Sequence, residues 1–118
     1  MADVNLIKNV APGLSEYVAC ESLSANDSLS FEFNQEITID DIVLDSVGEG
    51  TTYDVYFLYP ASGQKGYILY DIPVSSWFLN AGDNLAGKRW YHLPARTKLV
   101  FVPSTPVTLT VTVIGRSS

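Results

Sequence analysis

The amino-acid sequence predicts an all-β domain, an antiparallel β-sandwich with a jelly-roll-like arrangement of about eight to ten short strands. Apolar and polar residues alternate in residues 28–34 and 107–114, the pattern of strands that bury one face. Turn-forming residues separate such segments at intervals of about 8–12 residues, and no segment has the periodicity of an amphipathic helix. An immunoglobulin-like or discoidin-like sandwich fits these observations almost as well, so the connectivity stays open at this point.

The N-terminal half of the chain is expected to contain an arm followed by several strands. Residues 1–13 form an extended N-terminal arm or a first strand, and residues 14–118 form a single β-sandwich domain, a common size for one domain. No linker or internal repeat is evident. The strands predicted in this half are residues 4–10, 16–23, 28–34 and 36–47.

A change of phase within residues 36–47 predicts an irregularity in that strand. The apolar positions move from odd-numbered isoleucines to Ile42 and Leu44, which reverses the buried face. We therefore expect a β-bulge or corner at Asp40 and Asp41.

The C-terminal half is expected to begin with a β-hairpin. Residues 53–59 and 66–72 are rich in aromatic and β-branched side chains and flank the turn-forming residues 60–65. Residues 107–114 form a long, uncharged strand, which must be central in its sheet or covered by another chain to avoid aggregation. The remaining strands predicted in this half are residues 75–79, 88–93 and 97–102.

The charge of the chain argues against a nucleic acid partner, and its hydropathy argues against a membrane partner. Thirteen acidic and seven basic residues give a net charge of −6, and only four cations are concentrated, at Lys88, Arg89, Arg96 and Lys98. No apolar run approaches the roughly 20 residues that a spanning helix needs, and the first residues have no signal-peptide pattern. We therefore expect a soluble protein made in a cytoplasm, with no nucleic acid or membrane partner.

No group of residues suggests catalysis, a metal or a cofactor. Cys20 lies in an apolar stretch and is expected to be a small core residue, and His92 is the only imidazole. The acidic residues at 36–45 lack the spacing of a calcium loop, so a polar strand face explains them better. The sequence therefore predicts no enzyme, no catalytic residue, no metal site and no cofactor.

Aromatic residues are the best candidates for binding. They make up 12% of the chain, and Trp and Tyr are enriched at interfaces. Tyr56 and Phe57 point to opposite faces of one strand, so that strand is covered on both faces or exposes an aromatic ring. The candidate interface or ligand residues among them are Tyr56, Trp77, Trp90 and Tyr91. Stacking of sugar rings on such side chains, in a carbohydrate-binding module, is the alternative use.

In layout the chain resembles the capsid decoration (cement) proteins of tailed phages. The resemblance rests on the extended N-terminal segment, the compact β-body through residues 29–33 and 93–101, and the terminal Thr-Val strand. It implies a non-enzymatic virion protein that forms a homo-oligomer, a trimer above all, and clamps neighbouring subunits of the major capsid protein. It also implies that Leu6 and Ile7 of the arm carry part of the contact.

Overall fold

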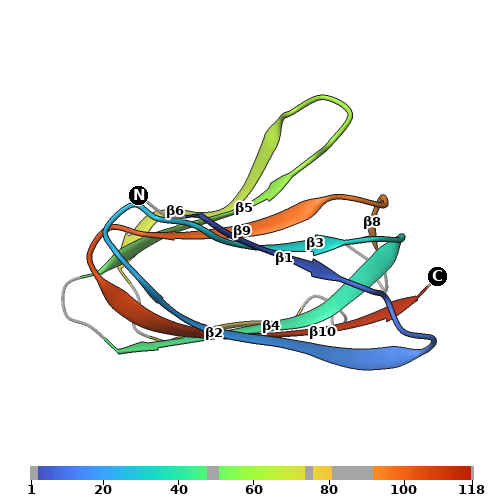
Figure 1. The fold of residues 1–118 in the computed structure, drawn as a ribbon, viewed down its shortest axis with the longest axis horizontal. Helices are drawn as coiled ribbons and strands as arrows, with labels where there is room; N and C mark the ends of the chain where they lie inside the picture. Colours follow the sequence, from blue (N-terminus) through green and yellow to red (C-terminus); the bar gives the residue numbers. More distant parts are fainter. Residues whose placement is uncertain (1–2, 48–50, 74–75, 81–91, 118) are drawn as a thin grey trace.

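Ten strands form two facing sheets in the computed structural model, which describes residues 3–47, 51–73, 76–80 and 92–117 (Figure 1). The strands are β1 (Val4–Lys8), β2 (Leu14–Leu23), β3 (Leu29–Phe33), β4 (Ile37–Val47), β5 (Thr52–Leu58), β6 (Lys65–Pro73), β7 (Ser76–Asn80), β8 (His92–Leu93), β9 (Lys98–Pro103) and β10 (Val107–Ser117). The described residues contain no helix, so the predicted all-β sandwich is confirmed. No helix in this part of the chain is long and apolar enough to cross a membrane.

The strand order is that of a jelly roll with one added strand in each sheet. Sheet A has the order β1-β3-β9-β5-β6, and sheet B has the order β2-β10-β4-β7, with β8 also paired to β4. From β2 to β10 the chain passes from one sheet to the other at each connection, except at the β5–β6 hairpin and between β7 and β8. All pairs are antiparallel except β1 with β3. The predicted hairpin across residues 60–65 is confirmed.

The two halves of the sandwich repeat one another, contrary to the expectation of no internal repeat. Residues 23–31 and residues 93–101 share Leu, Ala, Leu and Phe at matching places, and each segment leads through a turn into a central strand of sheet A. The pairing follows the repeat, because Leu23 pairs with Val107 of β10 and Leu93 pairs with Ile37 of β4. The β3–β9 pair therefore lies at the centre of an approximate twofold arrangement.

The core lies between the sheets and is built largely by alternation of inward and outward side chains along the strands. The inward side chains of β3 and β9 are fully buried, and the rings of Phe31 and Phe101 meet edge to face at a centroid distance of 6.3 Å. Each such apolar side chain contributes about 1.5–3 kcal/mol by its removal from water. Strand β10 lies between β2 and β4, so the long Thr-Val strand is central and a second chain is not needed to cover it.

The predicted bulge in β4 is confirmed at Asp40. Ile114 pairs with Asp41 while Gly115 pairs with Ile39, which leaves Asp40 as the extra residue on β4. Arg116 of β10 donates to the buried Asp40 carboxylate, with its Nε and Nη2 atoms 2.8 and 2.7 Å from Oδ2. This charge-assisted pair secures the irregular part of the sheet.

The prediction that Cys20 is a core residue is wrong, because its side chain is exposed. In β2 the inward positions belong to Tyr17, Ala19 and Leu23, so the alternation turns Cys20 to the outer face of sheet B. There its sulfur accepts a hydrogen bond from the hydroxyl of Thr110, at 3.4 Å.

We predict that Gly115→Ala lowers the free energy of unfolding by about 1–3 kcal/mol. A Cβ atom at this position would lie 2.8 Å from Ile37 Cδ1 and 3.0 Å from the carbonyl oxygen of Thr38, which cannot move without disturbing β4. Urea unfolding measures the change. The matched control is Gly66→Ala, whose Cβ would meet only the ring of Tyr59 at 3.4 Å. Equal stability of the two variants would contradict the close approach of β10 and β4.

We predict that the stability of the protein falls as the pH rises above about 10, in part because of Tyr53. Burial raises the pKa of the Tyr53 phenol above its ordinary value of 10.0, and the neighbouring Ser46 side chain opposes part of that rise. The unfolded chain therefore loses this proton at a lower pH than the folded protein, and ionisation favours unfolding. Urea unfolding at several alkaline pH values should show a smaller loss for Tyr53→Phe than for the wild type. An identical pH dependence of the two proteins would rule out the effect.

Candidate binding surface

The outer face of sheet A, which points away from sheet B, carries two rows of functional side chains. Strand register places Glu32 beside Lys98, Lys98 beside Leu58, and Leu58 beside Lys65, across four strands. The neighbouring row contains Val100, Tyr56 and Tyr67. Val100 is only 3% exposed although it belongs to the outer face, so surrounding side chains cover the sheet there.

Three tyrosines from β5 and β6 form what we call the tyrosine patch: Tyr56, Tyr67 and Tyr70. The ring centroids of Tyr56 and Tyr67 are 5.3 Å apart, and those of Tyr67 and Tyr70 are 5.0 Å apart with nearly perpendicular planes. Tyr67 is 46% exposed and Tyr70 is 65% exposed. The Lys65 ammonium lies 4.8 Å from the centre of the Tyr56 ring, a cation–π contact. The patch is thus an exposed aromatic surface with its own internal contacts.

Two bulges in β6 bring Tyr67 and Tyr70 to the same face. In a regular strand, residues three apart point to opposite faces. Here Tyr56 pairs with Tyr67 and Val55 pairs with Leu69, so Ile68 is an extra residue, and a second irregularity follows before Ile72. Ile68 and Leu69 both pack against the core, and the strand turns outward again at Tyr70.

A hollow of about 380 Å³ lies beside the patch, where the β5–β6 hairpin rises away from the rest of sheet A (Figure 1). We call it the charged hollow. Apolar side chains of the hairpin form one side, and charged side chains from β3, β9 and the turn before β9 form the other. Its lining residues are Glu32, Leu58, Tyr59, Pro60, Gly63, Arg96 and Lys98.

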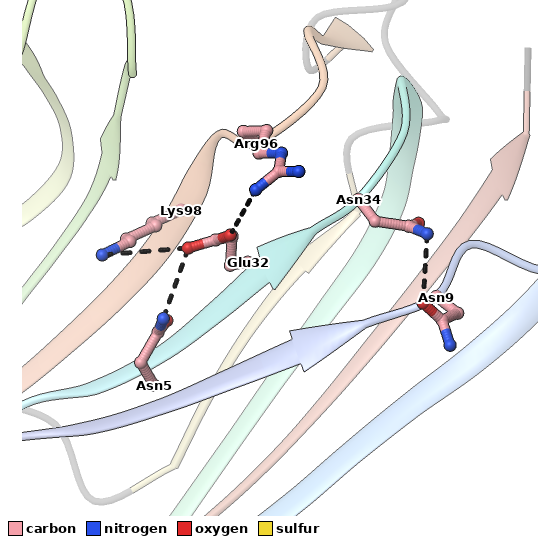
Figure 2. Close-up of polar contacts among 6 residues, drawn as sticks. All are labelled: Asn5, Asn9, Glu32, Asn34, Arg96 and Lys98. Carbon is pink, nitrogen blue, oxygen red and sulfur yellow. Dashed lines mark hydrogen bonds and ion pairs between the residues drawn. The ribbon is translucent and has the colours of Figure 1, made fainter.

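Glu32 is the centre of a polar network at the edge of the charged hollow (Figure 2). The side-chain amide of Asn5 donates to Glu32 Oε1 at 3.3 Å. Arg96 Nη1 lies 3.8 Å from Oε2 and Lys98 Nζ lies 3.9 Å from Oε1. These two distances are those of ion pairs and exceed the length of a hydrogen bond.

Arg96 occupies a backbone position that side chains rarely adopt. It is the third residue of a four-residue turn closed by the Thr97 amide, which donates to the Pro94 carbonyl at 3.3 Å, and its φ of 72° lies in the left-handed region. The Arg96 amide donates to the carbonyl of Phe33 at 2.8 Å, which fixes the turn against the end of β3. The side chain of Arg96 is 70% exposed. A residue held there costs about 1–2 kcal/mol relative to an ordinary conformation.

A second polar cluster, Thr38, His92 and Glu36, has the hydroxyl, imidazole and carboxylate sequence of a catalytic triad, but its hydroxyl is not accessible to a substrate. His92 Nδ1 lies 2.9 Å from the hydroxyl oxygen of Thr38, and His92 Nε2 lies 3.6 Å from the Glu36 carboxylate. Thr38 is only 4% exposed, so its hydroxyl cannot reach a substrate as a nucleophile would. Within the described ranges, no three His, Cys, Asp or Glu side chains are grouped as metal ligands.

The structure separates the residues that the sequence singled out. Tyr56 belongs to the tyrosine patch, and Ile7 is 64% exposed on β1. Leu6 and Trp77 are partly buried and pack against the core. Trp90 and Tyr91 lie outside the described residues.

Among the site residues that the sequence analysis did not choose as binding candidates, Tyr67 alone has a signal in the sequence. Tyr67 lies opposite Tyr56 across the predicted hairpin, so counting back from the turn identifies that pair. Tyr70 and Arg96 have no such signal, because the first depends on bulges and the second on a turn that favours Gly or Asn.

Comparisons with known proteins identify structural neighbours and no family. No protein-family model and no curated protein matches the chain. Among solved structures, a periplasmic lysozyme inhibitor of g-type lysozyme (PliG) from Aeromonas hydrophila has 11% identity and a TM-score of 0.42, covering 98% of this chain and 100% of that chain. PliG from Salmonella Typhimurium has 14% identity and a TM-score of 0.42, covering 97% of each chain. A mutant of PliG from Escherichia coli has 14% identity and a TM-score of 0.43, covering 96% of this chain and 99% of that chain.

These neighbours correct the expectations that followed from the phage resemblance. All three are named as periplasmic inhibitors of an enzyme, a non-enzymatic role, and not as virion proteins. The predicted function as a capsid decoration protein, the virion location, and the partnership with a capsid protein in a trimer are therefore wrong. The carbohydrate-binding alternative is not supported by these comparisons either.

Proposed function

We propose that the chain is a non-enzymatic protein-binding domain that docks a partner protein on the outer face of sheet A, at the tyrosine patch. The observation that carries this proposal is the contact of three tyrosines, two of them strongly exposed, on one face of a bulged hairpin. Tyrosine provides a large contact area at a small cost in side-chain entropy and keeps a hydroxyl for hydrogen bonding. Such residues dominate the binding energy of many interfaces.

The packing of the patch supports the same function. Tyr56 and Tyr67 are a cross-strand pair. Ile68 and Leu69 pack inward against the core, and this packing directs the rings of Tyr67 and Tyr70, on either side of them in the chain, outward. A surface that is ordered before binding loses less conformational entropy when the partner arrives. The adjoining charged hollow supplies polar and ionic groups at the rim, as interfaces of this kind do.

The outer face of sheet B is a less suitable docking surface. Its exposed apolar side chains include Val18 and Phe78, on the two edge strands. Register places Thr112 and Val43 between them, so Val18 and Phe78 are separated by two strands and form no cluster. Phe78 is therefore a suitable control position for experiments on the tyrosine patch.

We predict that a photo-cross-linking residue placed at Tyr70 captures one defined partner protein, whereas the same residue placed at Phe78 does not. The captured protein is then purified and its affinity for the chain is measured by calorimetry, with a g-type lysozyme tested in parallel as one candidate. Tyr67→Ala and Tyr70→Ala should each weaken binding about tenfold or more, since buried tyrosines act as hot spots. Phe78→Ala should leave the affinity unchanged. Equal capture at both positions, or unchanged affinity of both tyrosine variants, would refute the proposal.

A further inference from the structure

Positive charge gathers at one end of the binding face of an acidic protein. The chain has a net charge of −6 and seven basic residues, yet Lys65, Arg96 and Lys98 all lie at the hairpin end of the outer face of sheet A. Among the described residues, Glu32 is the one carboxylate that lines the charged hollow. The hollow is therefore locally cationic, and its field favours an acidic group.

The approximate twofold arrangement shows that the fold does not require this charge. At the opposite end of the β3–β9 pair, the places of Arg96, Lys98 and Glu32 are taken by Asn26, Ser28 and Val102. A smaller hollow of about 130 Å³ lies there, and Asp54 and Asp71 are among its lining residues. The two ends thus share the same strands and turns but carry opposite charge.

The turn at Arg96 has a counterpart in which the matching position is occupied by Asn26, a residue type that adopts left-handed backbone conformations more readily. The Asp27 amide closes a turn on the Ser24 carbonyl at 3.1 Å, and Asn26 has a φ of 65° at the place that matches Arg96. The Asn26 amide donates to the Pro103 carbonyl as the Arg96 amide donates to Phe33, both at 2.8 Å. Asparagine tolerates this conformation well, whereas arginine does not. A strained arginine at an exposed position points to a use for its side chain beyond folding.

We propose that the charged hollow binds a carboxylate side chain from an acidic segment of the partner protein, with Arg96 as the main anchor and Lys98 as its support. This inference rests on the proposed function and names the chemistry of the partner. The guanidinium of Arg96 presents a planar pair of donors that matches a carboxylate, and its loose pairing with Glu32 leaves it able to turn toward a ligand. Leu58, Tyr59 and Pro60 offer an apolar wall for the aliphatic or aromatic part of the same segment.

The test uses two capped peptides as probes and the full chain as receptor. Acetyl-Phe-Glu-Glu amide and its neutral match acetyl-Phe-Gln-Gln amide are titrated separately while the backbone amide signals are followed by nuclear magnetic resonance. The acidic peptide should produce saturable shifts at Arg96, Lys98 and Leu58, and the neutral peptide should bind roughly tenfold more weakly or not at all. The affinity should fall as the salt concentration rises from about 50 to about 300 mM.

Two matched glycine variants separate binding from folding. Arg96→Gly should weaken binding of the acidic peptide roughly tenfold and also raise the urea midpoint of unfolding, because glycine relieves the left-handed strain. Asn26→Gly changes the equivalent turn at the other end and should leave the affinity unchanged. Lys98→Met provides a second variant and should weaken binding without altering the turn. Equal binding of both peptides, shifts centred on Asn26 and Asp71, or full affinity of Arg96→Gly would each overturn the inference.

The outcomes also distinguish this inference from the proposed function. If the acidic peptide fails to bind while the cross-linker at Tyr70 still captures a partner, the carboxylate site is overturned and the protein-binding function stands. If the peptide binds at Arg96 while no partner is captured at Tyr70, the tyrosine patch is not a docking surface and the carboxylate site belongs to another function.

Discussion

The antiparallel pairing of β3 with β9 is the contact on which the rest of the structure depends. Its inward side chains, with Phe31 against Phe101, form the centre of the core, and its outward side chains include Glu32 and Lys98 of the charged hollow. Because successive residues of a strand point to opposite faces, one register determines both the packing and the binding face. A slip of one residue in this pair would exchange core and surface at the same time.

The candidate binding surface is formed by elements that do not follow the approximate twofold arrangement of the sandwich. The β5–β6 hairpin extends sheet A on the β9 side and has no counterpart at the β3 edge, where the single strand β1 pairs in parallel. On that side β1 is secured by polar contacts, including those of Asn34 with Asn9 (Figure 2) and with the Val10 amide. The hairpin instead rises from the sheet and brings aromatic side chains beside the cations of the β9 turn. The candidate site thus lies where the two halves of the sandwich differ most.

Much of the fold could be predicted from alternation and turn residues, because both act locally. The two sheets, the β5–β6 hairpin and the Asp40 bulge follow from phase and from turn chemistry. The face of Cys20 could not be predicted, since the residues from Tyr17 to Cys20 are all apolar or small and give no phase. The site could be predicted only in part from the sequence, because Tyr70 joins the patch through bulges in β6, and these depend on the inward packing of Ile68 and Leu69. Arg96 has a left-handed backbone conformation that arginine rarely adopts, so its residue type alone would predict a different conformation at this turn position.

The most direct test of this account is a measurement of ring-to-ring nuclear Overhauser effects among the tyrosines of the free protein. The bulged β6 predicts cross-peaks between Tyr67 and Tyr70, whose centroids are 5.0 Å apart, and between Tyr56 and Tyr67 at 5.3 Å. A regular β6 would instead pair Tyr70 with Tyr53 and turn its ring toward the core, near Tyr53 and Pro103. Cross-peaks from Tyr70 to those core residues, without a contact to Tyr67, would contradict the existence of the tyrosine patch and the binding function built on it.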